Sequence, residues 1–200
     1  MDSLGGKHAM YLLAARRPIL VLLALATLWS CDGLGPPTQN PNGPPPPDHP
    51  VNVKHDLLDL LKTAKQGNVS AVAQGLEKYL LDEADFKTLF GPKTSAVLWP
   101  TYRDGIAVDF KREAAQVFME RARAGLTEVT YHRNGPNNRA ETNRGDEAVL
   151  DGMQTVHRMF SFRIARPGEA LGLRLNGFVY VNGHWRALLK TGDTLRTMDR

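Results

Sequence analysis

After residue 50, hydrophobic residues first recur at the three- and four-residue spacing of amphipathic helices. The first pattern ends at Gly67, a residue type common just past the end of a helix. Asp82 is placed to cap a short third helix, which Gly91-Pro92 ends. A long fourth pattern begins near Pro100, since proline suits the first turn of a helix, and it closes at Gly125. The spacing therefore predicts helices over residues 53–67, 68–81, 83–90 and 100–125.

The rest of the chain alternates apolar and polar residues, or gathers aromatic and β-branched ones, as strands do. Asn182-Gly183 lies between two such runs, and this dipeptide is the strongest short signal for a type I′ hairpin turn. A two-residue loop sets the register, so Tyr180 faces Trp185 and Phe178 faces Ala187, all four on one face of the sheet. The sequence predicts strands within residues 126–133, 154–167, 169–181 and 184–191.

Helices followed by an antiparallel meander predict an α+β fold, with the N-terminal helices packed on one face of a curved antiparallel sheet. Residues 134–148, between the first two strands, lack large apolar side chains and predict a surface loop or a long hairpin tip. This segment is rich in Asn, Asp and Glu, but the ligand spacing and central glycine of an EF-hand loop are absent. We therefore predict no calcium site there.

The start of the chain has the composition of an export signal. Lys7, Arg16 and Arg17 precede an almost wholly apolar run over residues 19–30, which ends at the only cysteine of the chain, Cys31. A membrane-spanning helix needs about 20 apolar residues, so this run is too short to span. A basic segment, a short apolar core and small residues at its end describe a secretory signal peptide, with Met10 as an alternative start.

Leu28-Trp29-Ser30-Cys31 resembles the lipobox of bacterial lipoproteins, although Trp29 stands where a small or aliphatic residue is usual. The resemblance implies that the signal is cut before Cys31, that this thiol is acylated with a fatty acid such as palmitate, and that the lipid anchors the protein to a membrane of the bacterial cell envelope. It does not distinguish the inner from the outer membrane. The alternative is an ordinary cleaved signal followed by a chance cysteine.

Eight of the residues 33–50 are proline, so this segment predicts a disordered, extended tether between the anchor and a folded domain. The predicted organisation is a signal peptide over residues 1–30, the lipidated cysteine and linker over 31–50, and one domain over 51–200. Loss of the signal lowers the formal net charge from +4 to +2, because it removes three basic residues and one acidic residue. No basic stripe with interleaved aromatics is present, so nucleic acid is not an expected partner.

The order of the predicted elements, and the segment "GFVYVNGHWRALLK" near the end, resemble the NTF2-like family over Val53 to Lys190. A cystatin-like sheet wrapped on a helix is a close alternative. The NTF2-like family includes ketosteroid isomerases, scytalone dehydratases and many non-enzymatic bacterial domains. The resemblance implies a cone-shaped domain, and it implies no particular reaction, because it rests on architecture and not on a catalytic motif.

An isomerase of this type needs a carboxylate base in an apolar cone, with an acid or phenol donor opposite. The chain offers Asp85, Asp151 and Glu128 as carboxylates and Tyr102 or Tyr131 as donors. None of them lies in a motif that assigns a role, and Asp85 falls where an acidic first-turn residue is expected in any helix. We therefore predict no catalytic residue.

His132 and His157 lie on predicted strands, where two histidines and a carboxylate can bind a metal. Spacing alone does not bring them together, so we expect histidines that face solvent or form hydrogen bonds, with no metal and no cofactor.

Aromatic residues supply the remaining candidate site. They are numerous enough either to fill a core or to line a pocket for an apolar small molecule. We predict a membrane-anchored module that binds a small apolar ligand or a protein partner of the envelope; the alternative is an isomerase- or dehydratase-like enzyme. The candidate ligand-binding residues are Trp99, Tyr102, Phe178, Tyr180 and Trp185.

Overall fold

The structure is a computed structural model that describes residues 43–135, 137, 138 and 142–198. The predicted signal peptide, Cys31 and the linker up to residue 42 lie outside the described residues. The described residues belong to one compact unit, Gly43–Arg200. Over this part of the chain, no helix is both long and apolar enough to cross a membrane.

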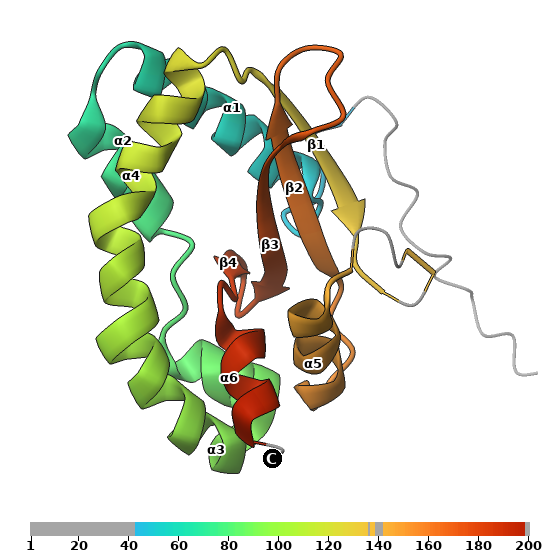
Figure 1. Cartoon of the computed structure of the whole chain (residues 1–200). Helices are drawn as coiled ribbons and strands as arrows, with labels where there is room; N and C mark the ends of the chain where they lie inside the picture. The colour runs from blue at the N-terminus through green and yellow to red at the C-terminus, as the bar shows by residue number, and fades with distance from the viewer. Residues whose placement is uncertain (1–42, 136, 139–141, 199–200) are drawn as a thin grey trace, which may run out of the picture. The chain divides into compact units, whose positions relative to one another are not determined.

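The α+β architecture is confirmed. Helices come first, and the strands then form one antiparallel sheet in the order β1-β2-β3-β4 (Figure 1). The helical part contains α1 (Val51–Lys65), α2 (Val69–Glu77), α3 (Glu83–Thr101), the π-helical turn η1 (Tyr102–Ile106) and α4 (Ala107–Arg123). The remainder contains β1 (Glu128–Arg133), α5 (Arg144–Gly152), β2 (Met159–Ala165), β3 (Gly172–Val181), β4 (His184–Ala187) and α6 (Thr191–Met198).

The predicted break at Gly91-Pro92 is present, but it is a kink of one residue and not the end of the helical segment. Gly91 has φ 74° and ψ 168°, which interrupts α3, and a helical segment then resumes at Pro92. Pro100 therefore lies inside α3 and does not begin the next helix as predicted. The π-helical turn η1 follows α3 directly and joins it to α4. Proline has no N–H and so interrupts the regular helical hydrogen bonds, and a π-helical turn is one way in which the backbone groups near a proline find other partners.

Two helices were missed by the pattern of apolar residues. Helix α5 occupies the end of the predicted loop 134–148, where Asn143 and Asp146 form a capping box at its start. Helix α6 follows β4, which ends at Ala187 and not at residue 191 as predicted. The helix α6 buries one apolar side chain, Leu195, which is too weak a pattern to predict a helix.

The hairpin between β3 and β4 follows the prediction. Tyr180 pairs with Trp185, and Phe178 pairs with Ala187. Asn182 and Gly183 have φ values of 49° and 84°, as both central residues of a type I′ turn require. Glycine adopts this conformation at no steric cost, and asparagine tolerates it.

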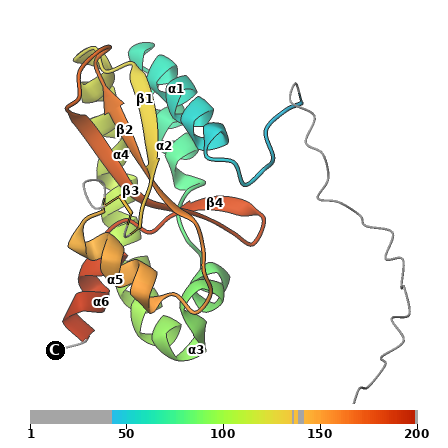
Figure 2. The same ribbon diagram turned by 90° about the vertical axis from the view of Figure 1, so that its right-hand side faces the viewer.

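The hairpin lies between two hydrophobic clusters, so both of its faces are covered. One face carries Phe178 and Trp185 into a cluster with α1, α2 and α4. The other carries Val179 and Val181 into a second cluster, which contains Phe86 of α3 with residues of α5 and α6. Figure 2 shows α3, α5 and α6 gathered beside β4 at one end of the sheet. The expectation that helices cover a single face is therefore wrong at this end.

The last residues of the predicted linker belong to the folded unit. Trp185 Nε1 donates to the carbonyl of Pro47 at 3.0 Å, and Asn52 Nδ2 donates to that of Pro46 at 2.8 Å. Pro50 is buried at the start of α1. The contacts of the domain therefore begin before Val51. A proline-rich segment can make such contacts because a proline residue, although it has no N–H, keeps a carbonyl that accepts hydrogen bonds.

Candidate functional site

A cavity of about 350 Å³ lies between α4 and the strands β3 and β4. Its size falls in the lower part of the range of small-molecule sites, about 300–1,000 Å³. The apolar part of the wall comes from α2, α4 and the sheet, and includes Leu76, Phe110, Ala114, Phe118, Leu173, Leu175, Phe178 and Leu189.

Charged and polar side chains lie among the same lining residues. Asp109 and Glu113 come from successive turns of α4 and are exposed. Arg174 and Asn176 come from β3, and Lys190 follows β4. The wall thus combines a mostly apolar surface with a few polar groups, which is the usual composition of a ligand site.

Two backbone features shape the sheet side of this cavity. The pairing of β2 with β3 shifts register between Phe160 and Phe162, and Gly177, in the bulged part of β3, has φ 73°. Leu189 has φ 46°, which is unusual for a residue with a side chain. A β-bulge redirects the side chains beside it, and strained backbone tends to gather at functional sites.

A second cavity of about 360 Å³ shares Asn176, Leu189 and Lys190 with the first. Half of its other lining residues are polar or charged, Asp146 among them, and apart from Gly177 of β3 they come from α5, α6 and the segments just before these helices. Burial raises the pKa of the Asp146 carboxyl above its ordinary value. Because Asn176 and Leu189 line both cavities, they lie where the apolar cavity meets the polar one.

The five aromatic residues predicted to bind a ligand separate in the structure. Phe178 lines the apolar cavity. Tyr102 is buried in the second hydrophobic cluster, with Trp99 stacked on it at 6.2 Å between ring centroids. Trp185 is buried in the first cluster, with Tyr180 packed edge-to-face against it. All five therefore belong to the two hydrophobic clusters, and Phe178 is the one among them that also contributes to the cavity wall.

Tyr102 forms hydrogen bonds that explain its burial. Its hydroxyl accepts from the Leu81 N–H at 3.1 Å and donates to the Ala187 carbonyl at 3.4 Å. Burial raises the pKa of this phenol, so it stays protonated. Tyr102 thus joins the segment before α3 to the end of β4, and both of these hydrogen bonds are to backbone groups.

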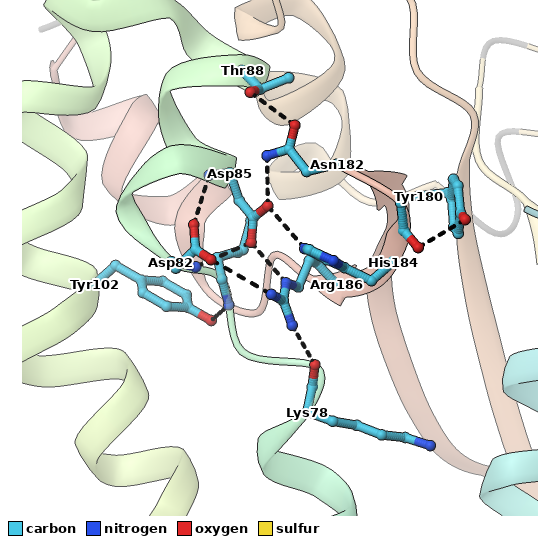
Figure 3. A network of polar contacts seen from close by, with 11 residues as sticks. Lys78, Asp82, Asp85, Thr88, Tyr102, Tyr180, Asn182, His184 and Arg186 are labelled. Atoms are coloured by element: carbon cyan, nitrogen blue, oxygen red, sulfur yellow. Dashed lines mark hydrogen bonds and ion pairs between the residues drawn. The ribbon is translucent and has the colours of Figure 1, made fainter.

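Asp85 is the centre of a polar network, which we call the Asp85 clamp (Figure 3). Oδ1 of Asp85 accepts from Asn182 Nδ2 at 2.9 Å and lies 3.2 Å from His184 Nε2. Oδ2 accepts from Arg186 Nε at 2.7 Å and from the Asp82 N–H at 3.1 Å. The carboxylate is fully buried and joins the first turn of α3 to the β3–β4 hairpin.

The clamp keeps Asp85 ionised. Burial works to raise its pKa, but the hydrogen bonds from the Asp82 backbone, Arg186 and Asn182 outweigh burial and hold the pKa below its ordinary value. A general base needs a free lone pair and a pKa near the working pH. Asp85 has neither, so it is a structural carboxylate and not a catalytic base.

Asp82, Asp85 and His184 each offer an atom that a metal ion could use, all within 4.8 Å of one another. The Arg186 guanidinium is bonded to the same Asp85 carboxylate and carries a positive charge. A cation would have to displace it and break the clamp. The residues therefore do not fit a metal.

The other candidate carboxylates and donors lie apart from the cavity. Asp151 is exposed on α5, and Glu128 is exposed and accepts from the Gly168 N–H. Tyr131 packs on Phe160 and Phe162. None of the three lines the apolar cavity.

Both predicted histidines are partly buried, and neither lies in the one metal-compatible group found among the described residues. His132 is on β1, and its backbone pairs with that of Ser161. His157 lies before β2 and contacts the Thr155 hydroxyl through Nε2 at 2.7 Å. The structure does not bring the two together.

Sequence reasoning missed a second buried network. Oδ2 of Asp146 accepts from Asn134 Nδ2 and from the Asn143 N–H, both at 3.1 Å. Arg174 Nη2 lies 3.5 Å from the same oxygen. The Ser161 hydroxyl donates to Asn134 Oδ1 at 3.0 Å. The spacing Asn143-x-x-Asp146 is a capping-box signal that would have predicted both α5 and the buried carboxylate.

Comparison of the chain with known family models, with curated proteins and with solved structures found no significant match.

Proposed function

We propose that this protein is a lipid-anchored lipoprotein of the bacterial cell envelope, whose NTF2-like domain binds a small apolar molecule in the cavity between α4 and β3. The observation that carries the binding proposal is the cavity itself, with its mostly apolar wall and few polar groups. The NTF2-like assignment is supported by α1, α2 and α4 packed against one face of an antiparallel sheet.

A binding function fits the carboxylates better than an enzymatic one. Asp146 comes closest to an acid–base group among the described carboxylates, because burial raises its pKa. However, its Oδ2 accepts two hydrogen bonds and lies near Arg174, and the side chain is part of the α5 cap. We therefore propose binding, with an isomerase- or dehydratase-like activity as the alternative.

The cavity predicts a specific pattern of photo-crosslinking. We expect an alkyl diazirine without a polar group to label the full chain on α4 and β3 peptides that line the cavity. Ala114→Phe should remove this labelling, because Ala114 lies on the wall and the larger ring fills the space. Mass spectrometry of the labelled peptides measures the result.

Gln116→Phe is the matched control. Gln116 is exposed, two residues from Ala114 and so on the far side of the same helix. The Gln116→Phe variant should leave the cavity labelling in place. Thermal unfolding of Ala114→Phe and Gln116→Phe tests whether both remain folded. Leu175→Phe is a second variant that fills the cavity, from the opposite wall. Labelling of these peptides that survives both filled cavities would contradict the proposal.

The anchor is tested at Cys31. In a bacterium that processes lipoproteins, the full chain should incorporate an alkyne analogue of palmitate and fractionate with membranes. Cys31→Ser should abolish the label, because serine offers no thiol to acylate. Ser30→Ala should keep it, since alanine preserves a small residue at the cut. Equal labelling of the wild type and Cys31→Ser would show that the cysteine is not the attachment site.

A further inference from the structure

Lys190 lines both the apolar cavity and the polar one, and no other basic residue that the structure describes lines both. Its side chain is exposed, and no described carboxylate forms an ion pair with it. A lysine side chain can lay its carbon stem along an apolar surface while the ammonium group stays in water. The ammonium group of Lys190 is therefore accessible to a molecule that lies where the two cavities meet.

The other charged residues on the apolar wall already have partners. Asp109 and Glu113 of α4 accept from Arg112 Nη2 at 2.6 and 2.8 Å, so the three side chains together carry one excess negative charge. Arg174 Nη2 lies 3.5 Å from Asp146 Oδ2, and these two formal charges cancel. The α4 side of the apolar cavity therefore repels an acidic group.

The polar cavity has an excess of positive charge. Arg144 and Arg196 line it together with Lys190, and all three side chains are exposed. None of the three forms an ion pair with a described residue. The acidic residues of this cavity are Asp193, which is exposed, and Asp146, whose charge is already offset. Three basic side chains therefore share the wall with one further acidic side chain, so the polar cavity favours an anion.

Two acidic residues of α5 reduce this excess without removing it at Lys190. Glu147 and Asp151 line a neighbouring hollow together with Arg144 and Arg196, and they line neither of the two cavities. Salt in the solvent weakens the effect of exposed charges that lie further away. Lys190 does not line the hollow, so among the three basic residues its charge is the least offset.

We propose that the ligand is an amphipathic anion, whose apolar body fills the apolar cavity and whose acidic head group, a carboxylate or a phosphate, binds the Lys190 ammonium where the two cavities meet. This rests on the proposed binding function and narrows the class of ligand. The head group lies on the side of the polar cavity, because the excess negative charge on α4 repels it from the other side. Arg144 and Arg196 add to the attraction on that side.

Competition against the diazirine probe tests this selectivity in the full chain. The competitors are decanoate, decyl phosphate and neutral decanol, which share one alkyl chain. The advantage of each anion over decanol should fall about 2- to 5-fold in Lys190→Met, as expected for the loss of one partly exposed ion pair. Comparing this ratio between variants cancels differences in membrane partitioning. Decylammonium should change in the opposite direction, because the substitution removes a repulsion.

Lys190→Arg keeps the charge and should keep the wild-type ratio. Lys65→Met is the matched control, because Lys65 is exposed at the end of α1 and lines neither cavity. A ratio that is unchanged in Lys190→Met, or that falls equally in Lys65→Met, would overturn the proposal. An equal loss in Lys190→Arg would also overturn it, because the charge would then not be the cause.

The same measurement distinguishes the two head groups. A larger fall for decyl phosphate assigns a phosphate, and a larger fall for decanoate assigns a carboxylate. If the probe labels the cavity but the ratios do not depend on Lys190, only this inference fails. If the probe does not label the cavity at all, the proposed function fails with it.

Discussion

Replacement of Asp85 by alanine is expected to lower the free energy of unfolding by about 3–5 kcal/mol, the usual cost of breaking a buried ion pair by removing one partner. The Arg186 side chain, which is largely buried, would keep its charge and lose its shortest contact to a carboxylate. Asn182 would lose its bond to the same group, and α3 would lose half of its capping box. Urea denaturation measures the difference.

The pH dependence of this effect has a defined sign. The pKa of Asp85 in the folded protein lies below its ordinary value, which is about 3.9. The clamp therefore contributes its full stability above about pH 4 and loses it as the pH falls through the lower, folded-state pKa. The stability difference between the wild type and Asp85→Ala should be constant near neutral pH and shrink in acid.

Asp151→Ala is the matched control for Asp85. Asp151 is exposed on α5, so its removal should change stability by no more than about 0.5 kcal/mol. If Asp85→Ala were as mild as this control, the carboxylate would not be a structural clamp. A constant stability difference down to strong acid would show that the folded protein does not hold Asp85 ionised.

Replacement of Trp185 by alanine should cost about 3–5 kcal/mol, the range for truncation of a large buried aromatic side chain. Trp185 is 9% exposed and packs edge-to-face on Phe160 and Tyr180. Its indole N–H also donates to the Pro47 carbonyl. The variant should unfold at lower denaturant, and the segment before α1 should become more sensitive to protease.

Trp185→Phe separates packing from hydrogen bonding, because it keeps a ring and removes only the indole N–H. We expect it to cost less than the alanine variant, with about 0.5–1.5 kcal/mol from the lost bond to Pro47. Neither variant should abolish crosslinking in the apolar cavity of the folded protein, because Trp185 is not among its lining residues. A small effect of Trp185→Ala on stability with a large effect on crosslinking would place the indole in the binding site instead.

Local signals in the sequence predicted much of the fold. The Asp82 cap, the break at Gly91 and the register set by Asn182-Gly183 all depend on residues close together in the chain. Their chemistry acts over a few residues, so it can be read without a structure. The α+β class followed from the same evidence, because the change from helical to alternating spacing occurs once along the chain.

The sites depended on contacts that spacing does not contain. Asp85 was a candidate base in the sequence, yet hydrogen bonds from Asn182 and Arg186, about 100 residues away, make it a clamp. All five candidate aromatic residues belong to the hydrophobic clusters on the two faces of the β3–β4 hairpin, and only Phe178 among them also lines the cavity. An aromatic side chain has the same pattern in a sequence whether it fills a core or lines a cavity.

The sequence by itself determined the class of fold, the hairpin register and the prediction of a lipid anchor at Cys31. Only the tertiary structure decided where the cavity lies and that the Asp85 carboxylate is held in a buried network with Asn182 and Arg186. The physical reason is that a bulge in β3 and the close approach of Leu188 to Gly177 orient this strand, and both arise from pairing with distant segments.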